Sequence, residues 1–111
     1  MSVTTVRKGS VCVVSVDGAL TSDCVEQFGE QVRQAFADGA HDFVVDMSEA
    51  TGINSKGLEA LTRLRRECDE RLGMIKLCSL SPVLKKILEI TRLTGRFEQY
   101  EALPEALESF K

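Results

Sequence analysis

The sequence contains one histidine, His41, and its cysteines are widely spaced. A zinc site is usually built from closely spaced Cys or His ligands, so the common zinc patterns are excluded. A lone histidine with no evident Ser or Cys partner also argues against a hydrolytic triad. We expect His41 at the surface near a strand start, no metal, no cofactor, and reduced, mostly buried cysteines typical of a reducing compartment. The cysteines are Cys12, Cys24, Cys68 and Cys78.

Long apolar runs and an excess of positive charge are missing too. No segment approaches the roughly 18 to 20 apolar residues that a transmembrane helix needs, and residues 1–9 lack the pattern of a signal peptide. We therefore expect a cytoplasmic protein without direct membrane insertion. The formal net charge is -3 and the pI is about 5.2. This balance argues against nucleic acid or an anionic membrane as the main partner, because both attract basic patches.

The motifs of common enzymes are missing as well. No glycine-rich loop of the P-loop or dinucleotide-binding type occurs. Asp46 and Glu49 are close in sequence, but neither a third ligand nor a base accompanies them. We therefore predict a non-enzymatic protein with no catalytic residue, and we favour a surface that docks a protein partner.

The remaining composition fits one globular domain over residues 1–111. The chain has 111 residues, of which 43% are hydrophobic and 28% are charged. This mixture is typical of a folded chain with a single core rather than of a disordered one. No internal repeat, low-complexity segment or linker divides it.

Five short segments are predicted to be strands. Residues 3–6 and 11–16 flank a turn at residues 8–10, which predicts an antiparallel hairpin with the first strand at the sheet edge. The Asp17-Gly18 pair predicts the end of the second strand. The β-branched run at residues 11–16 is typical of a strand buried on both faces. Residues 41–47, 74–78 and 97–100 predict the other three strands.

Helical patterns alternate with these strands. The first helix is expected from Thr21–Asp23 to Asp38, with Gly39 as its stop, and the second from Asn54 or Ser55 to Gly73. The third should begin at Ser81-Pro82, and a short fourth lies near the C-terminus. Their predicted inward residues are Leu58, Leu61, Leu64, Cys68 and Leu72 in the second helix, Val83, Leu84, Ile87, Leu88 and Thr91 in the third, and Leu103, Ala106, Leu107 and Phe110 in the fourth.

This alternation predicts an α/β fold. We expect a single mixed, mainly parallel β-sheet with an antiparallel N-terminal edge hairpin and about four α-helices. In such sheets, binding residues gather in the loops after the carboxyl ends of the strands. Here those loops are residues 18–22, 48–56 and 79–81, all rich in small polar side chains.

The loop at residues 46–58 is the most distinctive of these. Asn54 and Ser55 are helix-capping residue types, and a helix start can hold an anion. Lys56 opposes the helix dipole from the first turn. The predicted partner-binding residues are Gly18, Leu20, Ser22, Ser48, Asn54, Ser55, Lys56, Gly57, Leu58 and Ser81.

The outer face of the second helix is strongly charged. Glu59 and Arg63 are four residues apart in the order that favours an ion pair. The cluster of Arg63, Arg65 and Arg66 is interleaved with the acidic residues that follow it. This interleaving favours a solvated face over a binding stripe.

The loop and its flanks resemble the STAS domain family, which includes bacterial anti-sigma-factor antagonists. The family signature is D-x-S, four residues, a hydrophobic residue and then D-S-S-G-L. Here it reads Asp46-x-Ser48 and then residues 53–58, I-N-S-K-G-L. Residues 16–20, 80–83, 87–93 and 105–107 are also similar to family segments, so the resemblance covers nearly the whole chain.

The resemblance implies a partner-switching regulator. In that mechanism the unphosphorylated antagonist binds an anti-sigma factor, which is also a serine kinase, and so frees the sigma factor. The kinase then phosphorylates a Ser or Thr at the start of the second helix, and the complex separates. A phosphate adds about -1.5 to -2 charges at the docking surface, which is consistent with release by repulsion.

This chain departs from the signature at the critical position. Lys56 stands where the usual phosphoacceptor serine stands, and Asn54 replaces the preceding aspartate. The loop thereby becomes more positive by about two charge units. Three interpretations stay open: an antagonist that phosphorylation here cannot switch off, Ser55 as a substitute acceptor, or a STAS module in a transport or signalling complex, for example in lipid transport. For Ser55 itself, the sequence favours a capping role over phosphorylation.

Overall fold

The computed structural model describes residues 2–110 and contains one five-stranded sheet. The strand order is β1-β2-β3-β4-β5, with β1 antiparallel to β2 and the other pairs parallel, which confirms the predicted fold class. The elements are β1 (Ser2–Lys8), β2 (Val11–Leu20), α1 (Ser22–Ala37), β3 (Asp42–Ile53), α2 (Ser55–Glu70), β4 (Ile75–Cys78), α3 (Pro82–Ile90), a 3₁₀ turn (Thr94–Arg96), β5 (Glu98–Tyr100) and α4 (Leu103–Glu108).

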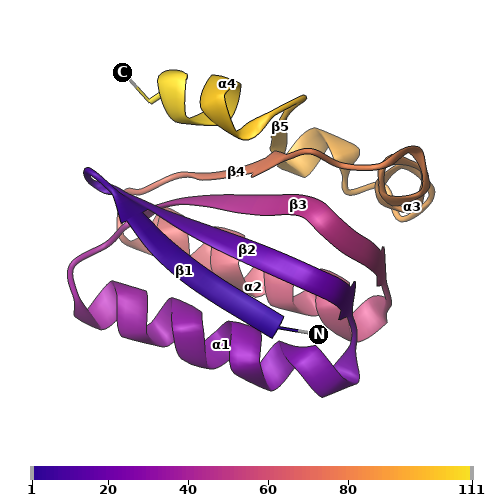
Figure 1. The fold of residues 1–111 in the computed structure, drawn as a ribbon, viewed down its shortest axis with the longest axis horizontal. Coiled ribbons are helices and arrows are strands. Elements are labelled where there is room, and N and C mark those ends of the chain that lie inside the picture. Colours follow the sequence, from indigo (N-terminus) through magenta and orange to yellow (C-terminus); the bar gives the residue numbers. More distant parts are fainter. Residues whose placement is uncertain (1, 111) are drawn as a thin grey trace.

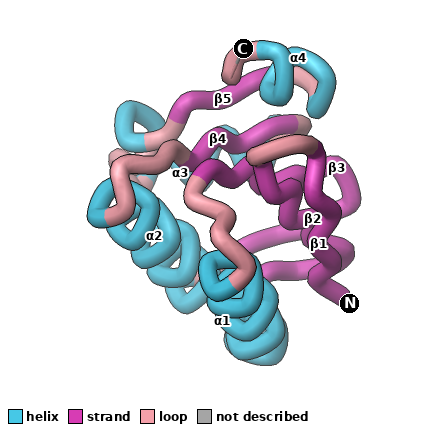
Figure 2. The backbone as a smooth tube through the Cα atoms, turned by 90° about the vertical axis from the view of Figure 1, so that its left-hand side faces the viewer, coloured by secondary structure: helices cyan, strands magenta, loops and turns pink. Residues whose placement is uncertain are grey.

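The sheet separates two hydrophobic clusters of unequal size. Figure 1 shows α1 and α2 on one face, α4 on the other, and α3 at one end of the sheet. Figure 2 shows α1 and α2 side by side from another direction. The larger cluster lies under α1, α2 and α3 and includes Phe28, Phe43 and Leu61, and the smaller lies under α4 around Val44 and Ala106.

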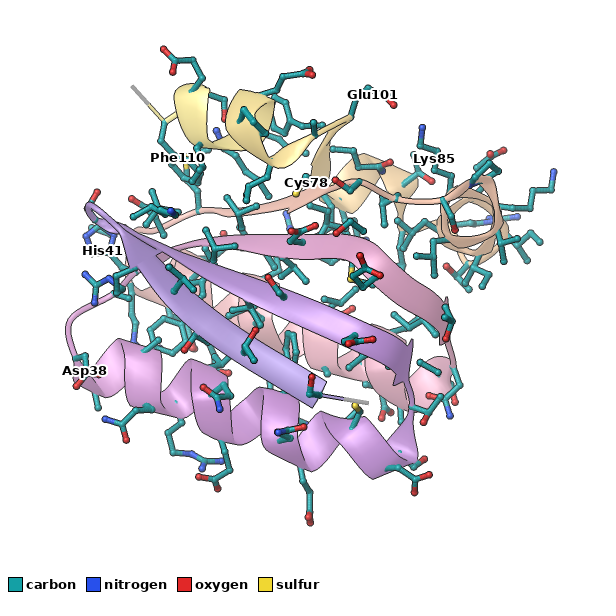
Figure 3. The ribbon with its side chains drawn as sticks, in the orientation of Figure 1. Asp38, His41, Cys78, Lys85, Glu101 and Phe110 are labelled. Atoms are coloured by element: carbon teal, nitrogen blue, oxygen red, sulfur yellow. The ribbon has the colours of Figure 1, made fainter. Side chains whose placement is uncertain are left out.

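A buried lysine anchors α4 to the sheet. Lys76 is 2% exposed, and its Nζ donates to Ser109 Oγ at 2.7 Å and lies 4.1 Å from the centroid of the Phe110 ring. Figure 3 shows Cys78 and Phe110 on the side of the sheet that α4 covers. The charge of Lys76 is therefore used inside the fold rather than at the surface.

The strands β2 and β3 are longer than the sequence predicted. The expected end at Asp17-Gly18 is wrong, because β2 continues to Leu20 and pairs there with Ile53 of β3. The register shifts between Ser15 and Asp17, and again after Gly18, which has a φ of 98°. Irregular backbone pairing of residues 17–20 with residues 49–53 extends both strands beyond the continuous apolar runs that predicted them.

The end of α1 confirms a prediction, and the end of α2 corrects one. Gly39 follows α1 with a φ of 97°, as expected for a helix stop. By contrast, α2 ends at Glu70, and Leu72 has a φ of 59° and is 93% exposed, so its inward placement was wrong. Gly73 lies outside the helix, where a Cβ would collide with the His41 carbonyl oxygen. That close approach explains why a glycine stands there.

The helix α3 buries a narrower face than predicted. Leu84 and Leu88 are buried, and Ile87 is half-buried against the core. Val83 is 62% exposed and Thr91 is exposed, so the prediction of an inward position was wrong for both. Thr91 caps the helix end and donates its hydroxyl to the Ile87 carbonyl at 2.8 Å.

All four cysteines are free and buried, as predicted. Burial, together with a smaller contribution from nearby carboxylates, raises the pKa of the Cys68 thiol to about 12. Burial also raises the pKa of Cys78 to about 11, with a second contribution from the charge of Asp46. Both thiols are protonated near neutral pH and are poor nucleophiles. His41 is exposed just before β3, as expected.

Candidate functional site

The candidate site lies where the parallel strands end. The strands β2 and β3 finish side by side, with Leu20 opposite Ile53, and α2 begins at Ser55. The helix α3 follows the carboxyl end of β4, so it lies at the same end of the sheet, as Figure 1 shows. The topology therefore brings together the three loops that the sequence singled out.

Asn54 is the residue that caps α2. Its Oδ1 accepts a hydrogen bond from the Gly57 N–H at 3.1 Å, and its own N–H donates to the Leu20 carbonyl at 3.3 Å. The sequence assigned capping to Asn54 or Ser55 and favoured a cap as the role of Ser55, and for Ser55 this is wrong. Ser55 is exposed in the first turn, and its hydroxyl makes no hydrogen bond to any residue that the structure describes. The Ser55 hydroxyl is therefore open to a partner or a modifying enzyme.

Gly57 allows α2 to lie directly on the end of β2. A Cβ at this position would collide with the Leu20 carbonyl oxygen and would lie 2.6 Å from Ile53 Cγ1. Gly57 and Leu20 are both buried, Leu20 completely. These two predicted partner-binding residues therefore support the surface from beneath, and their side chains do not form part of it.

Lys56 points away from Ser55, toward α1. Its Nζ lies 3.5 Å from Glu59 Oε2, and both side chains are 61% exposed. The predicted Glu59–Arg63 pair is replaced by this Lys56–Glu59 pair, which adds little stability in water. Lys56 and Glu59 also line a groove of about 890 Å³ between α1 and α2, floored in part by Phe28 and Leu64.

Ser55 borders a second, smaller hollow on the outer face of α2. It has a volume of about 380 Å³ and lies over the half-buried Leu58. Leu58 packs against the core, so the hollow has an apolar base. The hollow is lined by Ser55, Leu58, Glu59, Thr62, Arg63 and Arg66.

Asp46 shapes the strand that leads into the site. Its Oδ1 accepts from the Ser48 N–H at 3.0 Å, which gives the aspartate of the D-x-S segment a structural role. Asp46 lies opposite Cys78 in the neighbouring strand. No three metal-ligating side chains cluster anywhere within residues 2–110, including around Asp46 and Glu49.

The other predicted residues occupy the same end of the sheet. Ser81 caps α3, since its Oγ accepts from the Leu84 N–H at 3.2 Å. Ser22, the first residue of α1, and Ser48 are exposed, and Gly18 is half-buried. Ser22, Ser48 and Ser55 can therefore contact a partner, whereas the Ser81 hydroxyl serves mainly as a cap.

Two exposed apolar residues on α3 were missed. Val83 is 62% exposed and Ile90 is 70% exposed, and their spacing of seven residues places them on one face of the helix. The signal in the sequence was that apolar residues cover more of α3 than its core contacts need. Exposed apolar side chains near a polar site are a common feature of protein interfaces.

Within the described chain, no helix is both long and apolar enough to cross a membrane.

None of the curated proteins matches the sequence significantly. Several solved structures do match the fold of this chain. An anti-sigma-factor antagonist domain protein from Planctomyces limnophilus has a TM-score of 0.87 at 23% identity, covering 98% of this chain and 97% of its own. An anti-sigma factor antagonist from Mycobacterium paratuberculosis has a TM-score of 0.86 at 22% identity, covering 97% and 92%.

A third similar structure comes from another class of protein. It is a sulfate transporter family protein from Wolinella succinogenes, with a TM-score of 0.76 at 16% identity, covering 94% of this chain and 87% of that one. At these identities the structures establish the fold alone. The family model of the STAS domain matches residues 2–106. The chain therefore belongs to the STAS domain family.

Proposed function

We propose that this chain is a non-enzymatic cytoplasmic regulator of the anti-sigma-factor antagonist type. It binds a protein partner, a kinase-type anti-sigma factor, through the start of α2 and the outer face of that helix. The observation that carries the proposal is Ser55 at the end of the parallel strands: it is exposed, its hydroxyl makes no capping bond, and it borders a hollow with Leu58 at its base. STAS membership and the two similar antagonist structures support it.

Ser55, and not Lys56, is the position in the first turn of α2 that suits a phosphate. Lys56 has no hydroxyl to phosphorylate, whereas Ser55 lies in the first turn, where free N–H groups and the helix dipole stabilise negative charge. The Lys56 ammonium would also offset part of the added charge. A phosphate on Ser55 should therefore repel an acidic partner less strongly than a phosphate in the acidic family loop does.

Incubation with the partner kinase and ATP, followed by mass spectrometry, tests the switch. Phosphate on Ser55 would establish the substitute acceptor, and its loss in Ser55→Ala would confirm the position. If the kinase binds but no phosphate appears on any residue, the chain is an antagonist that phosphorylation does not release.

A second candidate function is a STAS module within a transport complex. The observation that favours it is the similarity to the sulfate transporter family protein. A pull-down with the tagged chain separates the two functions: a kinase-fold anti-sigma factor as the main captured protein supports the regulator, and a transporter subunit supports the module. Native mass spectrometry that shows a bound nucleotide or lipid would also favour the module.

A further inference from the structure

The basic residues of this acidic protein are concentrated in the part of the sequence that begins at Asn54. Ten of the fourteen lysines and arginines lie in residues 54–96, although the whole chain has a net charge of -3. Several of them have partners within the fold. Lys76 is buried, Arg65 lies 3.9 Å from Asp69, and Arg71 stacks on a phenylalanine ring. Lys85 Nζ lies 3.3 Å from Glu101 Oε1. Figure 3 labels Lys85 and Glu101.

Arg63 and Arg66, like Lys86, Arg92 and Arg96, are exposed and have no such partner, and these two lie on α2 beside Ser55. Neither makes an ion pair, hydrogen bond or ring contact with any described residue. Both line the hollow beside Ser55. Glu59 is the one carboxylate in that lining, and it is already paired with Lys56. The sequence favoured a solvated face for the cluster of Arg63, Arg65 and Arg66. Arg65, with its Asp69 contact, fits that prediction. Arg63 and Arg66 instead border the candidate site.

The hollow forms a continuous strip along α2. Positions 55, 58, 59, 62, 63 and 66 recur at three- and four-residue steps, so they share one helix face. At 1.5 Å per residue, the strip from Ser55 to Arg66 is about 16 Å long. It combines an apolar base at Leu58 with two guanidinium groups, which can each hold a carboxylate through two parallel hydrogen bonds.

We propose that this strip binds an acidic, apolar-centred segment of the partner protein. The proposal rests on the proposed function and specifies the partner's chemistry: leucine-like side chains over Leu58, and carboxylates beside Arg63 and Arg66. Asn54 and Lys56 make the cap and first turn of α2 more positive than the D-S-S form of the signature, which an acidic partner complements. Nucleic acid fits less well, because it needs many phosphate contacts and the charged residues before Asn54 are mainly acidic.

Two synthetic helical peptides of 18 residues test this inference. The Glu peptide carries Leu on one face of the helix and Glu on the other. The Lys peptide is identical except that Lys replaces each Glu. Each is titrated into ¹⁵N-labelled protein at low salt, and backbone NMR shifts report where it binds. We expect the Glu peptide to shift residues 55–66, with affinity falling at least tenfold in the double variant Arg63→Glu/Arg66→Glu. The matched charge reversal Arg7→Glu/Lys8→Glu, on the hairpin, should change affinity less than twofold.

The proposal is overturned if the Glu peptide causes no shifts, or if its shifts are centred outside residues 55–66. It is also overturned if the Lys peptide binds equally well, or if a single-stranded oligonucleotide or anionic vesicles bind more tightly than the Glu peptide. The variant Arg63→Gln/Arg66→Gln provides a second test with a smaller change in charge. The peptide experiment and the pull-down can fail separately. If the pull-down captures a kinase-fold anti-sigma factor but the Glu peptide does not bind, only the acidic segment is rejected. If the Glu peptide binds but no anti-sigma factor is captured, only the regulator is rejected.

Discussion

Gly57 lies so close to the Leu20 carbonyl oxygen that no side chain fits between them. This approach joins the first turn of α2 to the end of β2, and it sets where Ser55 and Lys56 emerge at the surface. The accessible part of the site therefore depends on a buried backbone contact. A change at this contact should disturb both stability and binding.

Gly57→Ala should destabilise the fold by about 1 to 3 kcal/mol or more, because the new methyl group meets rigid backbone. Urea unfolding followed by circular dichroism measures the change. Gly29→Ala is the matched control, since a Cβ at Gly29 meets nothing within 4 Å and the site lies inside α1. That variant should gain about 0.5 to 1 kcal/mol through helix propensity. Equal effects of the two substitutions would contradict the packing argument.

Asn54→Ala should cost about 1 kcal/mol, because it removes the side-chain acceptor for the Gly57 N–H. Asn54→Asp keeps that acceptor and should hold or slightly raise stability. Ser55→Ala should change the free energy of unfolding by less than about 0.5 kcal/mol, as for an ordinary surface substitution. A loss in Ser55→Ala as large as in Asn54→Ala would show that Ser55 is the cap after all.

Neighbouring residues on α3 should respond very differently to truncation. Leu84→Ala removes a buried side chain and should cost about 2 to 5 kcal/mol. Val83→Ala affects an exposed side chain and should cost less than about 0.5 kcal/mol. Thermal or urea unfolding of the two variants tests this, and a large loss in Val83→Ala would restore the inward position that the sequence predicted.

The buried thiols should make stability fall in alkaline solution. The pKa of Cys68 is raised to about 12 and that of Cys78 to about 11, from an ordinary value of 9.0. The unfolded chain therefore releases these protons first as the pH rises, and their contribution to stability is complete below pH 9 and lost between about pH 9 and 12. Urea unfolding at pH 8 and pH 10 measures the slope.

The double variant Cys68→Ala/Cys78→Ala provides the control for this slope. Alkali affects the rest of the protein as well, so only the difference from the parent protein is informative. The variant should be less stable at pH 8 because it loses buried volume, yet its stability should decline less steeply toward pH 10. Parallel pH profiles for the two proteins would contradict protonated, buried thiols.

The sequence predicted the order of elements because strong local signals mark it. The β-branched run at residues 11–16 and the F-V-V run within residues 41–47 are buried strands, and the glycine after Asp38 ends α1 as expected. The extension of β2 and β3 was not predictable in the same way. It depends on backbone pairing of residues 17–20 with residues 49–53, where register shifts interrupt the regular alternation of side chains that marks a strand in the sequence.

The errors at single residues also have physical causes. Leu72 continues the spacing of the α2 stripe but follows the end of the helix, and Val83 lies on a helix with more apolar surface than its core contact can bury. Asn54 and Ser55 are equally good caps by residue type, so only the observed backbone position separates them. The hollow by Arg63 and Arg66 is lined by α2 residues alone, at three- and four-residue spacing, so helical periodicity could have grouped them, whereas the interleaved charges predicted only a solvated face.

The central claim is that a kinase-type anti-sigma factor docks at the start of α2. Site-specific photo-crosslinking in cells of the source organism tests it most directly. The photoreactive residue replaces Glu59, whose side chain is 61% exposed and borders both the groove and the hollow. The same residue at Arg7 on the hairpin is the control. We predict a covalent adduct with a kinase-fold anti-sigma factor from position 59 and none from position 7. An adduct with a transporter subunit at position 59, or equal adducts from both positions, would contradict the account.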